Sequence, residues 1–244
     1  SVDKINAMQN AFGVCLLEGI TGSGKTQVYL ECIASVLNQG MQALVLVPEI
    51  GLTPQTLKRF EARFPAQCVA MHSNLTPKAR ALAWLSARSG HAKVVIGTRS
   101  AIFAPFLSLG IIIIDEEHDM SFKQQDSLRY HARDLAVVRA NKLNIPVVMG
   151  SATPSLETLY NVQRERYAVS YLTARATKAH MPHYHLIDLR REKIQHGLSQ
   201  KLLQAIKSHL AKDHQVLLFL NRRGFAPVLL CHQCAWTAKC RQCE

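Results

Sequence analysis

Eight consecutive residues near the start of the chain have the types and spacing of a phosphate-binding loop. They are Gly19, Ile20, Thr21, Gly22, Ser23, Gly24, Lys25 and Thr26, which match G-x-x-x-x-G-K-S/T without a gap. The glycines allow backbone conformations in which successive N–H groups face an anion. We expect Lys25 to reach the β- and γ-phosphates of ATP, and Thr26 to hold Mg²⁺ through its hydroxyl. The alternative, a glycine-rich turn with a chance lysine, is disfavoured by the strand and helix expected on either side.

A second group of chemically capable residues follows four isoleucines at 111–114. It reads Asp115, Glu116, Glu117 and His118. The isoleucine run predicts a strand buried on both faces, and open α/β sheets bind ligands at the carboxyl ends of their strands. We therefore expect Asp115 to hold Mg²⁺ and Glu116 to orient or deprotonate an attacking water. A solvated acidic turn is the alternative, and the phosphate loop argues against it.

Alternating strands and helices are expected to position these two groups. Apolar segments predict strands over 14–17, 43–47, 68–71, 93–96, 111–114, 147–149 and 169–172, and helices are expected over 25–38, 54–63, 77–88, 132–143 and 155–163. Thr53, Thr76 and Thr153 each precede a proline, which is typical of a helix start. The order predicts a doubly wound α/β domain with a parallel sheet. A further helix is expected over 199–212 and a strand over 216–220.

The composition indicates a folded protein with phosphate-bearing partners. Of 244 residues, 48% are hydrophobic and 19% are charged, which excludes a wholly disordered chain. Apolar runs of about 18 residues are absent from the sequence, and so is a secretory signal, so we expect a cytoplasmic protein without a membrane partner. The net charge is +12, of which +8 falls in residues 174–244. Such an excess favours nucleic acid as a partner, with a generally basic surface as the alternative.

Four of the seven cysteines lie together near residue 244. Cys231, Cys234, Cys240 and Cys243 form two C-x-x-C pairs separated by five residues. Such pairs can each offer two thiolates to tetrahedral zinc, with a redox pair or chance spacing as the alternatives. The remaining cysteines, Cys15, Cys32 and Cys68, stand singly and are expected to be buried thiols.

The acidic group after its hydrophobic strand resembles the DExH box of superfamily 2 helicases. Further segments resemble their motifs Ia (47–55), Ib (97–101) and III (150–153), an aromatic-rich loop (121–125 followed by 129–134), and the segment 219–227 that leads into the cysteines. The order of these motifs is closest to that of the primosomal replication-restart helicases. The resemblance implies an ATP-dependent 3′-to-5′ DNA helicase that couples ATP hydrolysis to translocation on single-stranded DNA and to unwinding, and that acts in primosome assembly at stalled forks.

The resemblance also implies roles for individual residues. DNA contacts fall on Arg99, Phe122, Lys123 and Tyr130, and coupling between the ATP and DNA sites falls on His118, Ser151 and Thr153. It implies two zinc ions in a full-length chain, each held partly by cysteines beyond residue 244. The implied partners are single-stranded and forked DNA, other primosome proteins and single-strand-binding proteins, and the implied location is the nucleoid.

The same resemblance predicts how the chain is organised. Residues 1–173 would form a RecA-like ATP-binding lobe 1, 174–198 a connector, 199–230 the start of a second RecA-like lobe, and 231–244 part of a cysteine-rich zinc module. The chain alone would hydrolyse ATP poorly without the later motifs of lobe 2, because an arginine finger contributes about 10³–10⁵ in rate. Two alternatives are a DNA translocase that does not unwind duplexes, and a zinc-dependent protein-docking module with a vestigial ATP site.

Overall fold

The computed structural model describes most of the chain and divides it into two compact units. The described residues are 1–8, 11–126, 128–175, 183–192, 194–195, 197–219, 233–234 and 236. The first unit is Ser1–Ala179 and the second is His180–Glu244.

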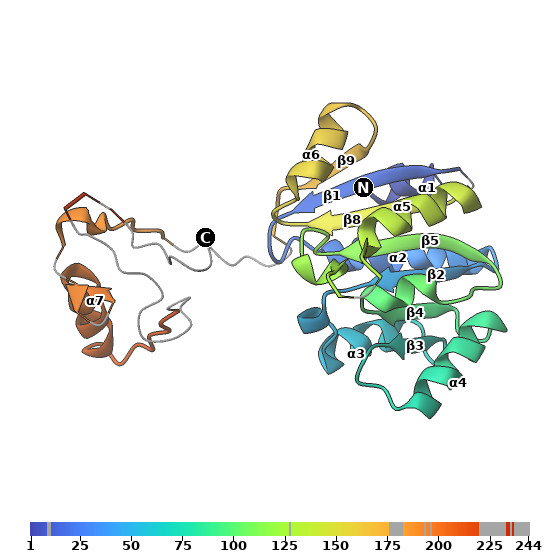
Figure 1. Cartoon of the computed structure of the whole chain (residues 1–244), viewed down its shortest axis with the longest axis horizontal. Helices are drawn as coiled ribbons and strands as arrows, with labels where there is room; N and C mark the ends of the chain where they lie inside the picture. The colour runs from blue at the N-terminus through green and yellow to red at the C-terminus, as the bar shows by residue number, and fades with distance from the viewer. Residues whose placement is uncertain are drawn as a thin grey trace. The chain divides into compact units, whose positions relative to one another are not determined.

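The first unit is built on a seven-stranded parallel sheet (Figure 1). Its strands are β1 (Gly13–Gly19), β2 (Gln42–Leu46), β3 (Cys68–Met71), β4 (Val94–Gly97), β5 (Leu109–Asp115), β8 (Pro146–Ser151) and β9 (Ala168–Leu172). They pair in the order β3-β4-β2-β5-β8-β1-β9, and each pairing is parallel. The seven strands and the doubly wound fold expected from the sequence are confirmed.

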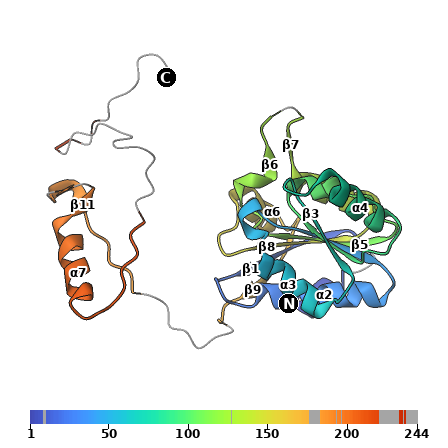
Figure 2. The ribbon, with the colours of Figure 1, turned by 90° about the horizontal axis from the view of Figure 1, so that it is seen from below.

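Helices cover both faces of this sheet (Figure 2). One face carries α1 (Val2–Asn6), α2 (Lys25–Asn38) and α3 (Pro54–Arg63), and the other carries α4 (Pro77–Arg88), α5 (Ala132–Leu143) and α6 (Leu156–Gln163). Ile111 and Ile113 belong to the apolar cluster under α2, whereas Ile112 and Ile114 belong to the cluster under α5. The unbroken isoleucine run is therefore explained by a strand that alternates between two buried layers.

Two of the three expected threonine caps are present, and the third prediction was wrong. The hydroxyl oxygens of Thr53 and Thr76 each accept a backbone N–H from three residues further on, at 3.2 Å. At α6 the cap is Ser155, which accepts from the Thr158 N–H at 3.3 Å, so the helix begins one residue after it. Thr153 lies two residues too early to cap this helix, and its own N–H donates to Ser151 Oγ at 3.0 Å.

Short elements complete the first unit around the sheet edge. They are three 3₁₀ turns, η1 (Glu49–Gly51), η2 (Arg99–Phe103) and η3 (Met120–Phe122), and the two-stranded hairpin of β6 (Lys123–Gln124) and β7 (Tyr130–His131). The hairpin stands out from the face that carries α4, α5 and α6 (Figure 2).

The second unit contains one helix and a small hairpin among its described residues. Its elements are η4 (Leu189–Arg191), β10 (Ile194–Gln195), β11 (Leu198–Ser199) and α7 (Gln200–Leu210). Ser199 caps α7 by accepting from the Leu202 N–H at 3.2 Å. The strand expected over 216–220 is not formed by its described part, 216–219, which has no strand pairing there, and Leu220 lies outside the described residues. The domain limits drawn from the sequence stay predictions.

Candidate nucleotide-binding site

The predicted phosphate loop connects the end of β1 to the start of α2. Gly24 caps the helix with φ of +89°, and Gly22 has φ of +78°. Both values lie in the left-handed region, where a Cβ would strain the backbone, so glycine is required at these two positions. The loop thus turns sharply enough for the first N–H groups of α2 to face solvent, where an anion can bind.

The phosphate loop and the acidic group line one hollow of about 380 Å³. Residues 20–26 line it together with Arg59, Asp115 and Glu116. The acidic strand β5 and the loop strand β1 are separated only by β8, and parallel strands bring their carboxyl ends to one edge of the sheet. Lys25 and Asp115 therefore lie on the same side of the sheet, as a shared nucleotide site requires.

Lys25 is buried in this hollow and already has partners. Its Nζ donates to the Gly19 carbonyl oxygen at 2.8 Å and lies 3.7 Å from Glu116 Oε1. The Ser23 hydroxyl is also buried, and no hydrogen-bond partner for it is found among the described residues. A buried hydroxyl left unpaired is costly, and a phosphate oxygen in the loop would satisfy it. The loop therefore fits a phosphate chain.

Asp115 and Thr26 supply the oxygen atoms that Mg²⁺ prefers. Burial raises the pKa of the Asp115 carboxyl, and the hydroxyl of Tyr29, which donates to Asp115 Oδ1 at 2.8 Å, acts in the opposite direction. Burial likewise raises the pKa of Tyr29 well above its ordinary value, so this phenol stays a hydrogen-bond donor. The sequence interpretation missed Tyr29, although an aromatic residue four positions after Lys25 on α2 faces the same way.

Glu116 has an unusual backbone conformation at the edge of the hollow. Its φ is +47°, which is strained for a residue with a side chain and is typical of functional sites. The carboxylate lies between two cations or potential cations, since Oε2 is 3.7 Å from His118 Nδ1 and Oε1 faces Lys25. The turn thus aims Glu116 into the hollow rather than into the core.

The three residues expected to couple the two sites lie together. His118 Nδ1 is 2.7 Å from Ser151 Oγ, and His118 Nε2 is 3.5 Å from Thr153 Oγ1. The acidic group is thereby joined to the end of β8. The coupling role of these residues stays a prediction, because contact alone does not show that information passes through it.

Glu117 lies between Glu116 and His118 in the sequence, and the sequence interpretation assigned it no role of its own. Its side chain is fully buried and accepts four hydrogen bonds, from Arg133 Nη1 at 3.0 Å, the Ser155 N–H at 2.7 Å, Ser155 Oγ at 3.1 Å and Thr158 Oγ1 at 2.9 Å. This network fastens the acidic turn to α5 and α6. The signal in the sequence was weak, because Arg133 is 16 residues away and nothing in its spacing marks a partner.

The residues expected to contact DNA meet at the β6–β7 hairpin. Arg99 Nη1 donates to the carbonyl oxygens of Ser121 and Lys123, both at 3.0 Å, so its guanidinium fastens the start of the hairpin to η2. Tyr130 packs edge-on against Phe103, with ring centroids 5.1 Å apart. These contacts position the hairpin, and a direct DNA contact by Arg99 stays a prediction.

Phe122 and Lys123 differ sharply in exposure. Phe122 is fully buried in the core, so it presents no ring surface on which a base could stack, and we correct that expectation. Lys123 is exposed and lines a hollow of about 560 Å³ with Arg129 and His131. The cationic side of the hairpin is thus the part available to a phosphate backbone.

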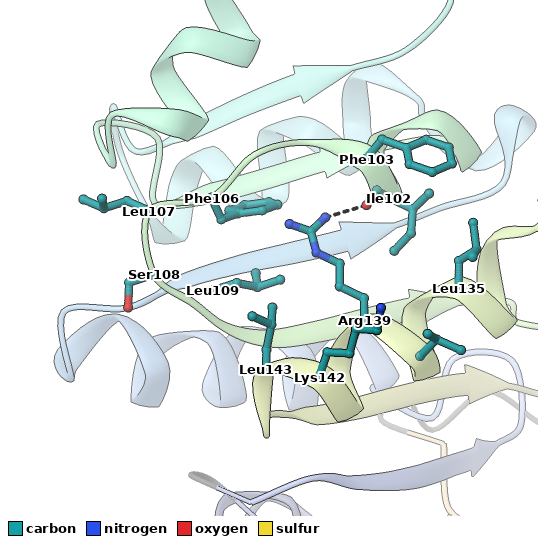
Figure 3. A pocket seen from close by; sticks show the side chains of 11 residues that line it. Ile102, Phe103, Phe106, Leu107, Ser108, Leu109, Leu135, Arg139, Lys142 and Leu143 are labelled. Carbon is teal, nitrogen blue, oxygen red and sulfur yellow. Dashed lines mark hydrogen bonds between the residues drawn. The ribbon is translucent and has the colours of Figure 1, made fainter.

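A separate hollow of about 530 Å³ lies between η2, the loop after it and α5 (Figure 3). Its walls are mainly apolar, and Arg139 reaches across it to donate to the carbonyl oxygens of Ile102 and Ala104. The guanidinium also lies over the Phe106 ring, 5.3 Å from its centroid. Arg139 therefore holds the turn against α5, and this hollow is distinct from the nucleotide site.

The predicted zinc ligands fall almost entirely outside the described residues. Cys231, Cys240 and Cys243 are not described, and Cys234 is exposed. Among the described residues, groups of three or more potential metal ligands are absent. In the same part of the chain, each helix is too short or too polar to cross a membrane.

A parallel sheet with a phosphate loop and a facing acidic strand end is the architecture of a P-loop nucleotide-binding domain. Residues 4–162 match the family described as DEAD/DEAH box helicase, and the chain belongs to that family. A solved structure of RecG bound to a three-way DNA junction is similar, with a TM-score of 0.50 and 25% identity, and it covers 72% of this chain and 23% of RecG. The RecA-like helicase fold implied by the resemblance is confirmed for the first unit.

Closer relatives lie among the replication-restart proteins. The chain is 59% identical over 235 residues to the replication restart protein PriA of Haemophilus influenzae, covering 96% of this chain and 32% of that protein. It is 43% identical over 235 residues to the PriA of Bacillus subtilis, covering 95% and 29%. The resemblance to the replication-restart helicases is thus confirmed, and the chain spans about a third of the length of these relatives.

Proposed function

We propose that the chain is a fragment of a 3′-to-5′ DNA helicase that acts in replication restart, and that its first unit is the ATP-binding lobe. One observation carries the proposal, namely that Lys25 and the Asp115–Glu116 pair line a single hollow beside the phosphate loop. The names of the relatives support the restart role, and the full activity belongs to a chain as long as theirs.

In this proposal the loop and the acidic group divide the work of ATP hydrolysis. The loop N–H groups and Lys25 bind the phosphates, with Lys25 leaving the Gly19 carbonyl that holds it here. Thr26 and Asp115 would hold Mg²⁺, which neutralises charge on the β- and γ-phosphates. Glu116 orients the attacking water and takes its proton, helped by a backbone turn that aims it into the hollow.

The hairpin and motif III supply the link to DNA. Lys123 binds the backbone and Tyr130 supports the hairpin, while Arg99 connects it to η2 next to the sheet edge. His118, Ser151 and Thr153 transmit the nucleotide state from the acidic group to β8. The proposed partners are single-stranded and forked DNA, other primosome proteins and single-strand-binding proteins, with the nucleoid as the proposed location.

Two zinc ions are proposed for a chain as long as the relatives. Cys231, Cys234, Cys240 and Cys243 would each pair with cysteines beyond residue 244. Metal analysis by mass spectrometry tests this: two zinc ions in the long chain and fewer in residues 1–244 are expected. Equal zinc content in both chains would contradict shared sites.

The ATP site is tested by Lys25→Ala, with Lys93→Ala, at the residue just before β4, as a control. We expect Lys25→Ala to lose nucleotide binding in the 244-residue chain, and DNA-stimulated ATP hydrolysis in a chain of the relatives' length. Persistence of both activities would favour the alternative of a docking module with a vestigial site.

The direction and the unwinding step need a separate measurement. Strand displacement by a chain of the relatives' length is measured on duplexes with either a 3′ or a 5′ single-stranded tail. We expect displacement only of the duplex with the 3′ tail. ATP-driven movement along DNA without displacement would instead identify a translocase.

A further inference from the structure

Tyr29 lies outside the recognised motifs and contacts the acidic group from the phosphate-loop helix. Its side chain is 1% exposed, and its hydroxyl donates to Asp115 Oδ1 at 2.8 Å. A hydrogen bond to a carboxylate is among the stronger ones in proteins, so it holds the group in one orientation. Together with a hydrogen bond from the Glu116 backbone, it restrains the rotation of the Asp115 carboxylate.

The alternation of the strands explains why these groups meet. Ile113 on β5 and Val148 on β8 face the layer under α2, so Asp115 and Gly150, each two residues further on, face the same layer. Asp115 and Gly150 are also direct neighbours in the register of β5 and β8. Tyr29, projecting from α2, therefore meets both at once.

Gly150 has to be a glycine because Tyr29 occupies the space of its side chain. A Cβ on Gly150 would overlap the phenolic oxygen of Tyr29 and would lie 2.8 Å from Cζ of the ring. Both approaches are closer than real Cβ contacts allow, and the ring is buried and cannot swing away freely. The missing side chain at Gly150 thus lets the hydroxyl reach Asp115.

We propose that Tyr29 is a positioning residue for Mg²⁺ binding. Its hydroxyl orients the Asp115 carboxylate, and it can reach that carboxylate because Gly150 has no side chain. The inference rests on the proposed function, because it takes Asp115 as a magnesium ligand. Tyr29 thereby links the phosphate-loop helix to Asp115 by a hydrogen bond and to the start of motif III by its contact with Gly150. A phenol that merely filled a gap in the core would have no effect on Mg²⁺.

The test measures binding of a fluorescent ATP analogue to the 244-residue chain, first with a chelator and then over a Mg²⁺ titration. Tyr29→Phe keeps the ring and removes the hydroxyl. We expect its affinity in chelator to stay within about twofold of the original, and its Mg²⁺ midpoint to rise about tenfold, as loss of a hydrogen bond to a charged group predicts. Tyr160→Phe, on the exposed side of α6, is the matched control and should change neither value.

Gly150→Ala provides a second route to the same hydrogen bond. The added methyl group displaces the phenol, so the Mg²⁺ midpoint should rise in the same direction. In a Tyr29→Phe background the same change should add little to the midpoint, because the hydrogen bond is already gone and the two effects are not independent. A full additional shift in the double variant would contradict an effect that passes through the Tyr29 hydroxyl.

The outcomes separate this inference from the proposed function. Lys25→Ala should weaken binding both with and without Mg²⁺. If it does, and the Mg²⁺ curve of Tyr29→Phe overlays that of the original chain, the role of Tyr29 is overturned and the nucleotide site stands. If Lys25→Ala binds the analogue as well as the original chain, the proposed site itself fails and the role of Tyr29 fails with it.

Discussion

Glu117 and Arg133 form a buried ion pair, with Arg133 Nη1 3.0 Å from Glu117 Oε2 and the Glu117 side chain fully shielded from solvent. The pair joins the turn after β5 to the first turn of α5. Hydrogen bonding to Glu117 raises the pKa of Arg133 despite its burial, so the guanidinium stays charged. Glu117, which is buried in the core, thus helps to position Asp115 and Glu116, which line the hollow.

Arg133→Ala is expected to destabilise the chain by about 3–5 kcal/mol, because it leaves the Glu117 carboxylate buried without its cation. Urea denaturation followed by circular dichroism measures the change. The matched control is Arg63→Ala, which breaks an exposed pair with Glu31 at 3.7 Å and should cost about 1 kcal/mol or less. Equal losses for the two variants would contradict a special role for the buried pair.

Arg99→Ala is expected to loosen the β6–β7 hairpin even without DNA, because two carbonyl oxygens at its start lose their donor. Limited trypsin digestion should cut faster after Lys123 and Arg129, with the sites read by mass spectrometry. Arg80→Ala is the control, since the Arg80 guanidinium likewise donates to a backbone carbonyl, that of Ser73 at 2.9 Å, but lies away from the hairpin. An unchanged digestion rate would restore the simpler view of Arg99 as a phosphate contact alone.

Ser151→Ala is expected to weaken the link between DNA binding and ATP hydrolysis, because Ser151 Oγ is the nearest partner of His118 Nδ1, at 2.7 Å. In a chain of the relatives' length, the ratio of DNA-stimulated to basal hydrolysis should fall about tenfold, a common size for coupling between sites. Ser170→Ala, at a half-buried position on β9, serves as the comparison. A ratio that matches the unchanged protein would show that His118 and Ser151 touch without coupling.

The thiols of Cys32 and Cys68 are expected to react slowly with iodoacetamide at pH 8, because burial raises their pKa to about 12 and about 11. A raised thiol pKa leaves less thiolate at a given pH, and the thiolate is the nucleophile. At pH values below the Cys68 pKa of about 11, the alkylation rate of this thiol should therefore rise about tenfold for each unit by which the pH is increased. Peptide mapping measures it, and the urea-unfolded chain is the control; fast labelling of the folded chain would show that these side chains open to solvent.

Local patterns accounted for much of the fold and for the central site. The phosphate loop is contiguous, so Gly22 and Gly24 could be assigned their turns without knowledge of distant partners. The strands and helices follow from apolar periodicity, which reports burial one residue at a time. Even the meeting of Lys25 with Asp115 follows, because parallel strands place their carboxyl ends at one edge.

Contacts between segments far apart in sequence were decided only by the tertiary structure. Whether Phe122 faces a base or the core depends on how η3 packs, and its spacing is compatible with both. The partners of Arg99 and Glu117 lie 16 to 41 residues away in the sequence, and no short-range pattern encodes such distances. The space at Gly150 filled by Tyr29 likewise exists only once α2 lies against β5 and β8, because a side chain's neighbours are set by packing and not by order along the chain.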